Sequence, residues 1–122
     1  MPFGIIKKGE KRMNFNPETL AKAVEAELDK RKAYDILTLN VTDKTSLADY
    51  FIIASGRSST QVTALAEHVE EEMEKQFGIT VRRREGIRDG RWAVLDFGDV
   101  IVHIFNDETR LFYHLERLWE SK

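Results

Sequence analysis

The sequence contains no cysteine, no long apolar run and no strong excess of charge of either sign. Without cysteine the protein has no disulfide, no thiolate nucleophile and no cysteine-ligated metal site. No apolar run approaches the roughly 20 residues that a transmembrane helix needs, and the amino terminus lacks the apolar stretch of a signal peptide. These absences predict a cytoplasmic protein that does not enter a membrane.

The length and the distribution of charge suit one globular domain. The chain has 122 residues, 42% of them hydrophobic and 33% charged. We expect residues 1–13 to form a flexible amino-terminal extension without an assigned function, and residues 14–122 to form a single domain. The net charge of −2 creates no field that would attract nucleic acid. The charge is uneven, however, with five glutamates between Glu67 and Glu74 and five arginines between Arg82 and Arg91.

Amphipathic periodicity predicts three helices. With the capping residue first, they run from Asn16 to about Arg31, from Ser58 to Phe77, and from Asn106 or Asp107 to about Trp119. Pro17 suits the first helical position, Ser58 and Gln61 have capping-box spacing, and Gly78 is a typical helix stop.

Five segments have the composition of strands. Three of them are Tyr34–Val41, Asp49–Gly56 and Ile79–Glu85. The second is almost continuously apolar, as in a strand that is covered on both faces. The third has few apolar residues, which predicts an edge position. The remaining two strands form a hairpin around the turn Gly98-Asp99.

The register of this hairpin follows from its turn. Phe97 pairs with Val100, Leu95 with Val102 and Ala93 with Ile104, so one face is entirely apolar. The other face mixes apolar and polar residues: Trp92, Val94, Asp96, Ile101, His103 and Phe105. Such a face either lies under a second helical layer or meets a partner. The element order predicts an α+β or mixed α/β fold with one five-stranded sheet flanked by helices.

Asp96-Phe97-Gly98 matches the letters of the magnesium-binding motif of protein kinases, but the other kinase motifs are absent. Asp96 and His103 are diagonal neighbours roughly 7–8 Å apart in the predicted hairpin, which is too far for a close ligand pair. Asp99 lies in the turn. No metal site, no Ser-His-Asp arrangement and no cofactor site is therefore predicted.

The stretch Gly56-Arg57-Ser58-Ser59 ends a strand and opens a helix, as in nucleotidyltransferases. In those enzymes the following strand carries metal-binding carboxylates. Here that strand carries Arg82, Arg83 and Arg84, so an enzyme of this type would lack its catalyst. An ordinary turn and helix cap is the better interpretation. The arginines allow a supporting RNA contact, although alternation sends Arg83 to the opposite face from its neighbours.

Four segments in order, "DYFIIASGRSSTQ", "REG", "WAVLDFGDVIVHIF" and "RLFYHLERLW", resemble the ribosomal silencing factor family, also called Iojap-like. The resemblance covers about Tyr34 to Trp119. It implies a nucleotidyltransferase-like fold without catalytic acids and a protein that is not an enzyme. It also implies binding to the large ribosomal subunit through ribosomal protein number fourteen (uL14), which blocks joining of the small subunit and represses translation. Organellar relatives assist subunit assembly.

The resemblance assigns the mixed hairpin face to partner binding. Trp92 would be the aromatic anchor, with Val94, Ile101 and Phe105 as its apolar surround. Asp96 and His103 would set the register, and Arg110 and Tyr113 would flank the hairpin from the last helix, either orienting it or contacting the partner. An exposed mixed face also allows a homodimer of the free protein. Two alternatives remain open, a diverged nucleotidyltransferase-like enzyme and an RNA-binding assembly factor.

Overall fold

The computed structural model describes the backbone of residues 16–113 and the side chains as far as Arg110. The elements in chain order are α1 (Pro17–Lys30), β1 (Tyr34–Asn40), β2 (Tyr50–Gly56), α2 (Ser59–Phe77), β3 (Arg83–Glu85), β4 (Trp92–Asp96), β5 (Val100–Asn106) and α3 (Asp107–Tyr113). The predicted amino-terminal extension and the predicted part of the last helix after Tyr113 lie outside the described residues.

The five strands form one mixed sheet in the order β1-β2-β5-β4-β3. The central pair, β2 and β5, is parallel, and the other three pairs are antiparallel. The prediction of a single five-stranded sheet flanked by helices is therefore confirmed. β3 lies at one edge and is exposed throughout, as its composition indicated, whereas β2 is central and almost wholly buried.

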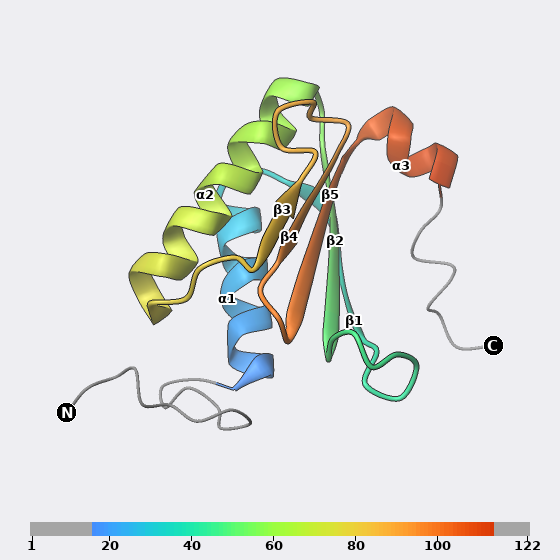
Figure 1. Ribbon diagram of the computed structural model, residues 1–122. Coiled ribbons are helices and arrows are strands. Elements are labelled where there is room, and N and C mark those ends of the chain that lie inside the picture. Colours follow the sequence, from blue (N-terminus) through green and yellow to red (C-terminus); the bar gives the residue numbers. More distant parts are fainter. Residues whose placement is uncertain (1–15, 114–122) are drawn as a thin grey trace.

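Helices α1 and α2 lie side by side on one face of the sheet (Figure 1). Their apolar stripes bury against the side chains that the strands turn toward them, and α2 reaches β4, β5 and β2. α3 lies on the other side of the sheet, near the end of β5 (Figure 1). The main core is thus a layer between the two long helices and one face of the sheet.

The predicted helix signals act as expected. The side chain of Asn16 accepts a hydrogen bond from the backbone N–H of Thr19 at 2.8 Å, and Ser58 Oγ accepts one from Gln61 at 3.1 Å. Both bonds satisfy amides that a helix start leaves free. Gly78 ends α2 in the left-handed conformation, with φ of 68°. These local signals fix where the two long helices begin and end.

The strand predicted over Ile79–Glu85 is shorter in the structure, which pairs only Arg83–Glu85. Ile79 is buried in the main core and Val81 packs against it. The first half of this segment therefore carries the chain from α2 to the sheet edge. Pairing with β4 begins at Arg83, next to a hydrogen bond in which the backbone N–H of Arg82 donates to the backbone carbonyl of Asp96 at 2.7 Å.

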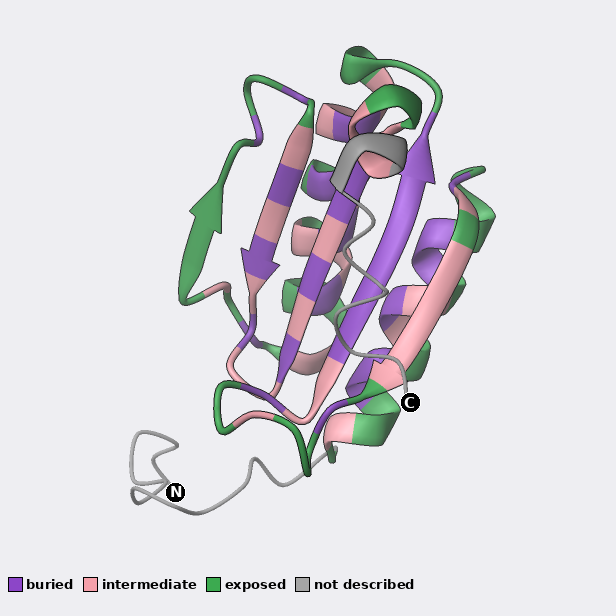
Figure 2. Cartoon of the chain, turned by 90° about the vertical axis from the view of Figure 1, so that its right-hand side faces the viewer, coloured by how far each residue is buried: buried purple, intermediate pink, exposed green. Residues whose placement is uncertain are grey.

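The hairpin of β4 and β5 has the predicted register. Leu95 pairs with Val102 and Ala93 with Ile104, and the N–H of Phe97 donates to the carbonyl of Val100 at 2.9 Å. All six residues of the predicted core face are buried. Figure 2 views the sheet from its opposite side, and half-buried residues alternate with buried ones along β4 and most of β5 because successive side chains point to opposite faces. No helix in the described part of the chain is long and apolar enough to cross a membrane.

Candidate functional site

The sheet surface opposite α1 and α2 is called the open face here, and it carries the mixed side of the hairpin. Five of its predicted residues are half-buried: Trp92, Val94, Asp96, Ile101 and His103. Of the described helices only the short α3 lies on this side, at one end of β5 (Figure 2). The predicted partner-binding residues of the strands thus share one surface that the two long helices leave uncovered.

Contacts with two described residues hold Trp92 in place on this face. Its ring stacks on Phe105 with the centroids 4.9 Å apart and the planes inclined by 26°. Its indole Nε1 donates a hydrogen bond to Nδ1 of His103 at 3.1 Å. The residues pair across strands, Trp92 with Phe105 and Val94 with His103. A half-buried tryptophan fixed in this way loses little side-chain freedom when a partner covers it.

His103 is neutral in the folded protein at ordinary pH. Burial lowers the pKa of its imidazole from 6.5 to about 4. Because the indole N–H can only donate, Nδ1 is the unprotonated acceptor and the proton lies on Nε2. Nε2 has no exposed surface and finds no hydrogen-bond partner among the described residues, and such a donor costs about 1–3 kcal/mol. The imidazole therefore serves as an acceptor for Trp92 rather than as a charged contact.

Phe105 differs from its predicted role, because its side chain is fully buried. It lies behind the indole of Trp92 and supports it, without surface of its own for a partner. Phe51 of β2 is also buried on this face, and its ring meets His103 edge-on at a centroid distance of 5.3 Å. The sequence places Phe51 only in a central strand, since a continuous apolar run does not reveal which rings touch.

Asp96 mainly stabilises the hairpin turn. Its Oδ1 accepts a hydrogen bond from the backbone N–H of Gly98 at 2.8 Å, and Gly98 has a φ of 99° that other residues rarely adopt. Its Oδ2 lies 4.0 Å from a guanidinium nitrogen of Arg83. The kinase-like letters thus form a turn. Within residues 16–110, no group of three or more His, Asp or Glu side chains is placed to hold a metal ion.

Arg110 fixes α3 to the sheet. Its guanidinium donates to the backbone carbonyl of Asp35 at 2.6 Å and to Ser55 Oγ at 2.9 Å. Asp35 lies at a bulge in β1 and has a φ of 49°, which is unusual for a residue other than glycine. Of its two predicted roles, these contacts support orientation. Tyr113 belongs to α3, but its side chain lies outside the described residues.

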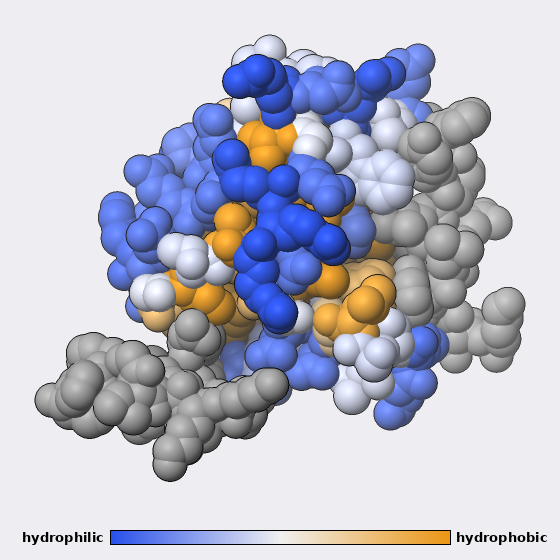
Figure 3. Space-filling model, in the orientation of Figure 1, coloured by the Kyte–Doolittle hydropathy of each residue, from blue (hydrophilic) through white to orange (hydrophobic). Residues whose placement is uncertain are grey.

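The arginine cluster separates onto two sides of the sheet, as alternation predicted. Arg84 reaches the helical side, where it lies 3.0 Å from Glu70 of α2, whereas Arg83 lies beside Asp96 on the open face. Figure 3 shows hydrophilic side chains running over this sheet edge, with hydrophobic ones to either side. Carboxylates beside the guanidinium groups offset part of the positive charge that an RNA backbone would need.

The turn from Gly56 to Ser59 is an ordinary helix start. Ser58 caps α2, and the side-chain oxygen of Gln61 accepts from the backbone N–H of Arg57 at 2.6 Å. Gly56 allows close packing on α2, because a Cβ atom there would lie 3.1 Å from a methyl carbon of Val62. Helix capping and close packing on α2 therefore explain why this turn resembles the one in nucleotidyltransferases.

Two residues beside the open face were not singled out from the sequence. Gly86 has a φ of 71°, and a Cβ atom on it would lie 2.1 Å from the carbonyl oxygen of Trp92, so only glycine fits there. The letters "REG" include this glycine, but the sequence does not show how closely its backbone approaches Trp92. Leu47, in the connection between β1 and β2, is 69% exposed. Its polar neighbours concealed it in the sequence.

A family model described as ribosomal silencing factor during starvation matches residues 14–122. The chain belongs to the ribosomal silencing factor family. It is 45% identical over 106 residues to ribosomal silencing factor RsfS of Zymomonas mobilis, which covers 87% of this chain and 79% of that protein. It is 38% identical over 104 residues to the protein of the same name from Bacillus subtilis, covering 85% of this chain and 87% of the relative.

More distant relatives and solved structures agree with this membership. The chloroplastic protein Iojap of Arabidopsis thaliana is 33% identical over 113 residues, which span 91% of this chain and 47% of that protein. A crystal structure of a Chromobacterium violaceum protein superposes with a TM-score of 0.84 at 32% identity, covering 88% of this chain and 89% of the other. A Bacillus halodurans structure has a TM-score of 0.76 at 34% identity and covers 86% of this chain and 97% of the other. The resemblance proposed from the four sequence segments is confirmed.

Proposed function

We propose that this protein represses translation by docking its open face on ribosomal protein uL14 of the large ribosomal subunit and sterically preventing the small subunit from joining. The observation that carries the proposal is the half-buried Trp92, held rigidly by His103 and Phe105 on a face that α1 and α2 do not cover. Membership of the ribosomal silencing factor family supports the choice of partner. The chain would make or break no bond in this role.

The energetics of such a contact favour a central aromatic anchor. Tryptophan is over-represented among the residues that dominate binding energy, and its effect is largest where surrounding contacts exclude water. Val94 and Ile101 lie half-buried on the same face and would form that surround. Because Trp92 is already fixed by stacking and a hydrogen bond, the loss of side-chain freedom on binding is small. Arg110 would act as a positioning residue for α3.

The charge of Asp96 contributes less than its sequence position suggests. One of its oxygens is committed to the turn, and the carboxylate lies near Arg83. Ribosomal proteins are generally basic, so an acidic face would still help orientation on approach. Asp96→Asn keeps the oxygen that accepts from Gly98 and removes only the charge. We expect this variant to slow association at low salt and to change the final affinity little.

Co-sedimentation with purified large subunits tests the proposal. Trp92→Ala should weaken binding by at least roughly tenfold, as truncation of an interface anchor does, and should restore joining of the small subunit in a subunit-joining assay. Trp92→Phe, which keeps the stack but not the hydrogen bond, should lie between this variant and the original protein. Glu71→Ala, on the exposed side of α2, is the matched control and should change neither readout.

Folding must be verified for each variant by its cooperative thermal unfolding. If folded Trp92→Ala protein binds large subunits and blocks joining as well as the original protein does, the open face is not the docking surface. If large subunits bind the protein and still join the small subunit, the protein binds the large subunit without silencing it. Such a result would favour the assembly role.

The other predicted partners are secondary to this face. A peripheral contact with ribosomal RNA would use the exposed Arg88 and the edge strand, and it would make part of the affinity salt-dependent. A homodimer of the free protein would use the same open face and so compete with the ribosome. Sedimentation of the free protein at rising concentration tests this, because Ile101→Asp should abolish a dimer formed through the open face.

A further inference from the structure

We propose that the connection between β1 and β2, residues 41–49, is a second contact point of the docking surface, in which Leu47 inserts into an apolar depression on a basic protein surface of the large subunit. This inference rests on the proposed function. It extends the contact beyond the hairpin to a segment that the sequence presented only as a polar connection.

Leu47 is the starting observation. It is the one large apolar side chain that is exposed in the described part of the chain, at 69% of its maximum. Single exposed leucines are ordinary on protein surfaces, so exposure alone does not indicate a binding site. The adjoining Ala48, by contrast, is buried in a small cluster on the open face. The backbone at this point therefore anchors one residue in the protein and presents the next one to solvent.

The 41–49 segment is closed and preformed by its own hydrogen bonds. Its two ends meet where the N–H of Val41 donates to the carbonyl of Asp49 at 2.8 Å. Inside it, the N–H of Leu47 donates to Thr45 Oγ1 at 3.1 Å. The N–H of Asp49 also donates to the carbonyl of Asp99 in the hairpin turn at 2.8 Å. A segment tied at these points would lose little freedom on binding, which is the condition under which an exposed anchor increases affinity.

The segment is continuous with the hairpin face. Figure 1 shows it projecting on the same side of the sheet as α3, at the opposite end. The small cluster beneath it consists of Val41, Ala48 and Phe51, with Leu39 and Ile101 packed against them. Phe51 in turn meets His103, the hydrogen-bond acceptor of Trp92. A row of contacts thus leads from Ala48, the chain neighbour of Leu47, through Phe51 and His103 to Trp92 across the open face.

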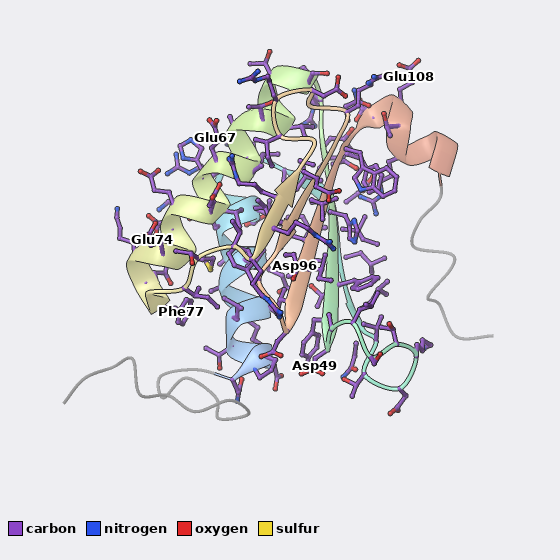
Figure 4. The ribbon with its side chains drawn as sticks, in the orientation of Figure 1. Asp49, Glu67, Glu74, Phe77, Asp96 and Glu108 are labelled. Atoms are coloured by element: carbon purple, nitrogen blue, oxygen red, sulfur yellow. The ribbon has the colours of Figure 1, made fainter. Side chains whose placement is uncertain are left out.

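The charges around Leu47 indicate the chemistry of the partner. Asp43 lies exposed in the segment, and Asp49 and Asp99 are partly exposed where the segment is tied to the hairpin turn. Figure 4 shows Asp49 at this end of the sheet, away from Glu67 and Glu74 on the outer side of α2. One lysine, Lys44, stands against the three carboxylates. An apolar anchor within an acidic rim is complementary to an apolar depression surrounded by lysine and arginine.

Equilibrium binding to purified large subunits tests the inference. Leu47→Asp should lower the affinity by about tenfold, the usual effect of losing an interface anchor, whereas Leu47→Met, which stays apolar, should remain within about threefold of the original protein. Thr80→Asp adds the same charge at an exposed position after α2 and is the control. Asp43→Asn should weaken binding by about two- to fivefold at low salt and less at high salt. Because Leu47 is exposed, none of its variants should lower the unfolding temperature.

The outcomes separate this inference from the proposed function. If Trp92→Ala loses binding while Leu47→Asp retains it, the second contact point is wrong and the hairpin face stands. If neither variant loses binding, both are wrong. If Leu47→Asp and Thr80→Asp lose affinity equally, the effect is general charge repulsion and the Leu47 contact is overturned. A loss confined to Leu47→Asp and Trp92→Ala supports the extended surface.

Discussion

The two faces of the β4–β5 hairpin are formed by alternate residues of the same two strands, yet they differ in how they are covered. Ala93, Leu95, Val102 and Ile104 turn toward α1 and α2 and have no exposed surface. Their neighbours on the open face, including Trp92 and His103, remain half-buried and are stabilised by ring contacts and one hydrogen bond. The first face is buried in the core and stabilises the fold. The second face leaves apolar surface that the fold does not cover.

This difference separates stability from binding within a single strand. A residue on the helix-covered face should affect unfolding strongly, and binding only through loss of the fold. A residue on the open face should affect binding more than unfolding. Four predictions test this separation, in order of decreasing effect.

Ile104→Ala and Ile101→Ala make the same change on opposite faces of β5. Ile104 is fully buried and Ile101 half-buried. We expect Ile104→Ala to lower the free energy of unfolding by about 2–5 kcal/mol because it leaves a cavity in the main core, and Ile101→Ala to lower it by about 1 kcal/mol. Urea unfolding measures both. Equal losses would mean that the two faces are packed alike.

Acid should destabilise the open face through His103. Its pKa is about 4 in the folded protein and 6.5 ordinarily, so the unfolded chain takes up the proton first as the pH falls. Stability is unaffected above about pH 6.5 and decreases from there to about pH 4, by up to roughly 3 kcal/mol. The described rings that contact His103 come from Phe51, Trp92 and Phe105 and carry no charge.

His103→Phe removes the titrating group and should flatten this part of the pH profile. The difference between the two unfolding profiles isolates His103 from the carboxylates, which titrate in both proteins. An identical slope between pH 6.5 and pH 4 in the two proteins would show that the imidazole is not buried as described.

Gly86→Ala and Gly78→Ala test whether the backbone beneath Trp92 is as crowded as it is described. Both glycines have positive φ, but a Cβ atom at position 86 would lie 2.1 Å from the carbonyl oxygen of Trp92, whereas one at position 78 meets nothing within 4 Å. We expect Gly78→Ala to cost about 1 kcal/mol from its backbone conformation alone, and Gly86→Ala to cost about 1–2 kcal/mol more. Thermal unfolding of the two variants measures these costs. A smaller loss of stability in Gly86→Ala than in Gly78→Ala would be incompatible with the close approach.

The smallest effect is expected at the sheet edge. Arg84 pairs with Glu70 at 3.0 Å, but both side chains are partly exposed, so Arg84→Ala should cost about 0.2–1 kcal/mol. Ribosome binding should fall far less than in Trp92→Ala, because Arg84 faces the helical side. If Arg84→Ala lost more ribosome binding than Arg83→Ala, the docking surface would lie on the helical side of the sheet and not on the open face.

Much of the fold was predictable because its signals are local. The turn Gly98-Asp99 fixes the register of its hairpin, and alternation then assigns each residue to a face. Asn16, Ser58 and Gly78 fix helix ends through contacts within a few residues. The parallel pairing of β2 with β5 was not predictable in this way, because it joins segments about fifty residues apart.

The candidate site was predictable in composition but not in detail. Alternation placed Phe105 beside Trp92, yet it could not tell that Phe105 would be completely buried. Arg110 donates a hydrogen bond to the backbone carbonyl of Asp35, which lies at a bulge in β1. No local sequence pattern reveals this contact. Leu47 was hidden because exposure is a property of the folded surface. Each of these differences depends on how the whole chain folds and not on a local sequence pattern.

The absence of cysteine allows the most direct test of the central claim, that the open face meets the ribosome. One cysteine introduced as Val94→Cys lies on the open face, and one introduced as Glu71→Cys lies on the outer side of α2. Each protein is treated with a maleimide alone and with purified large subunits, and labelling of the protein is followed with time. The docking account predicts that large subunits protect position 94 and leave position 71 reactive. Protection of position 71 with continued labelling at position 94 would contradict it.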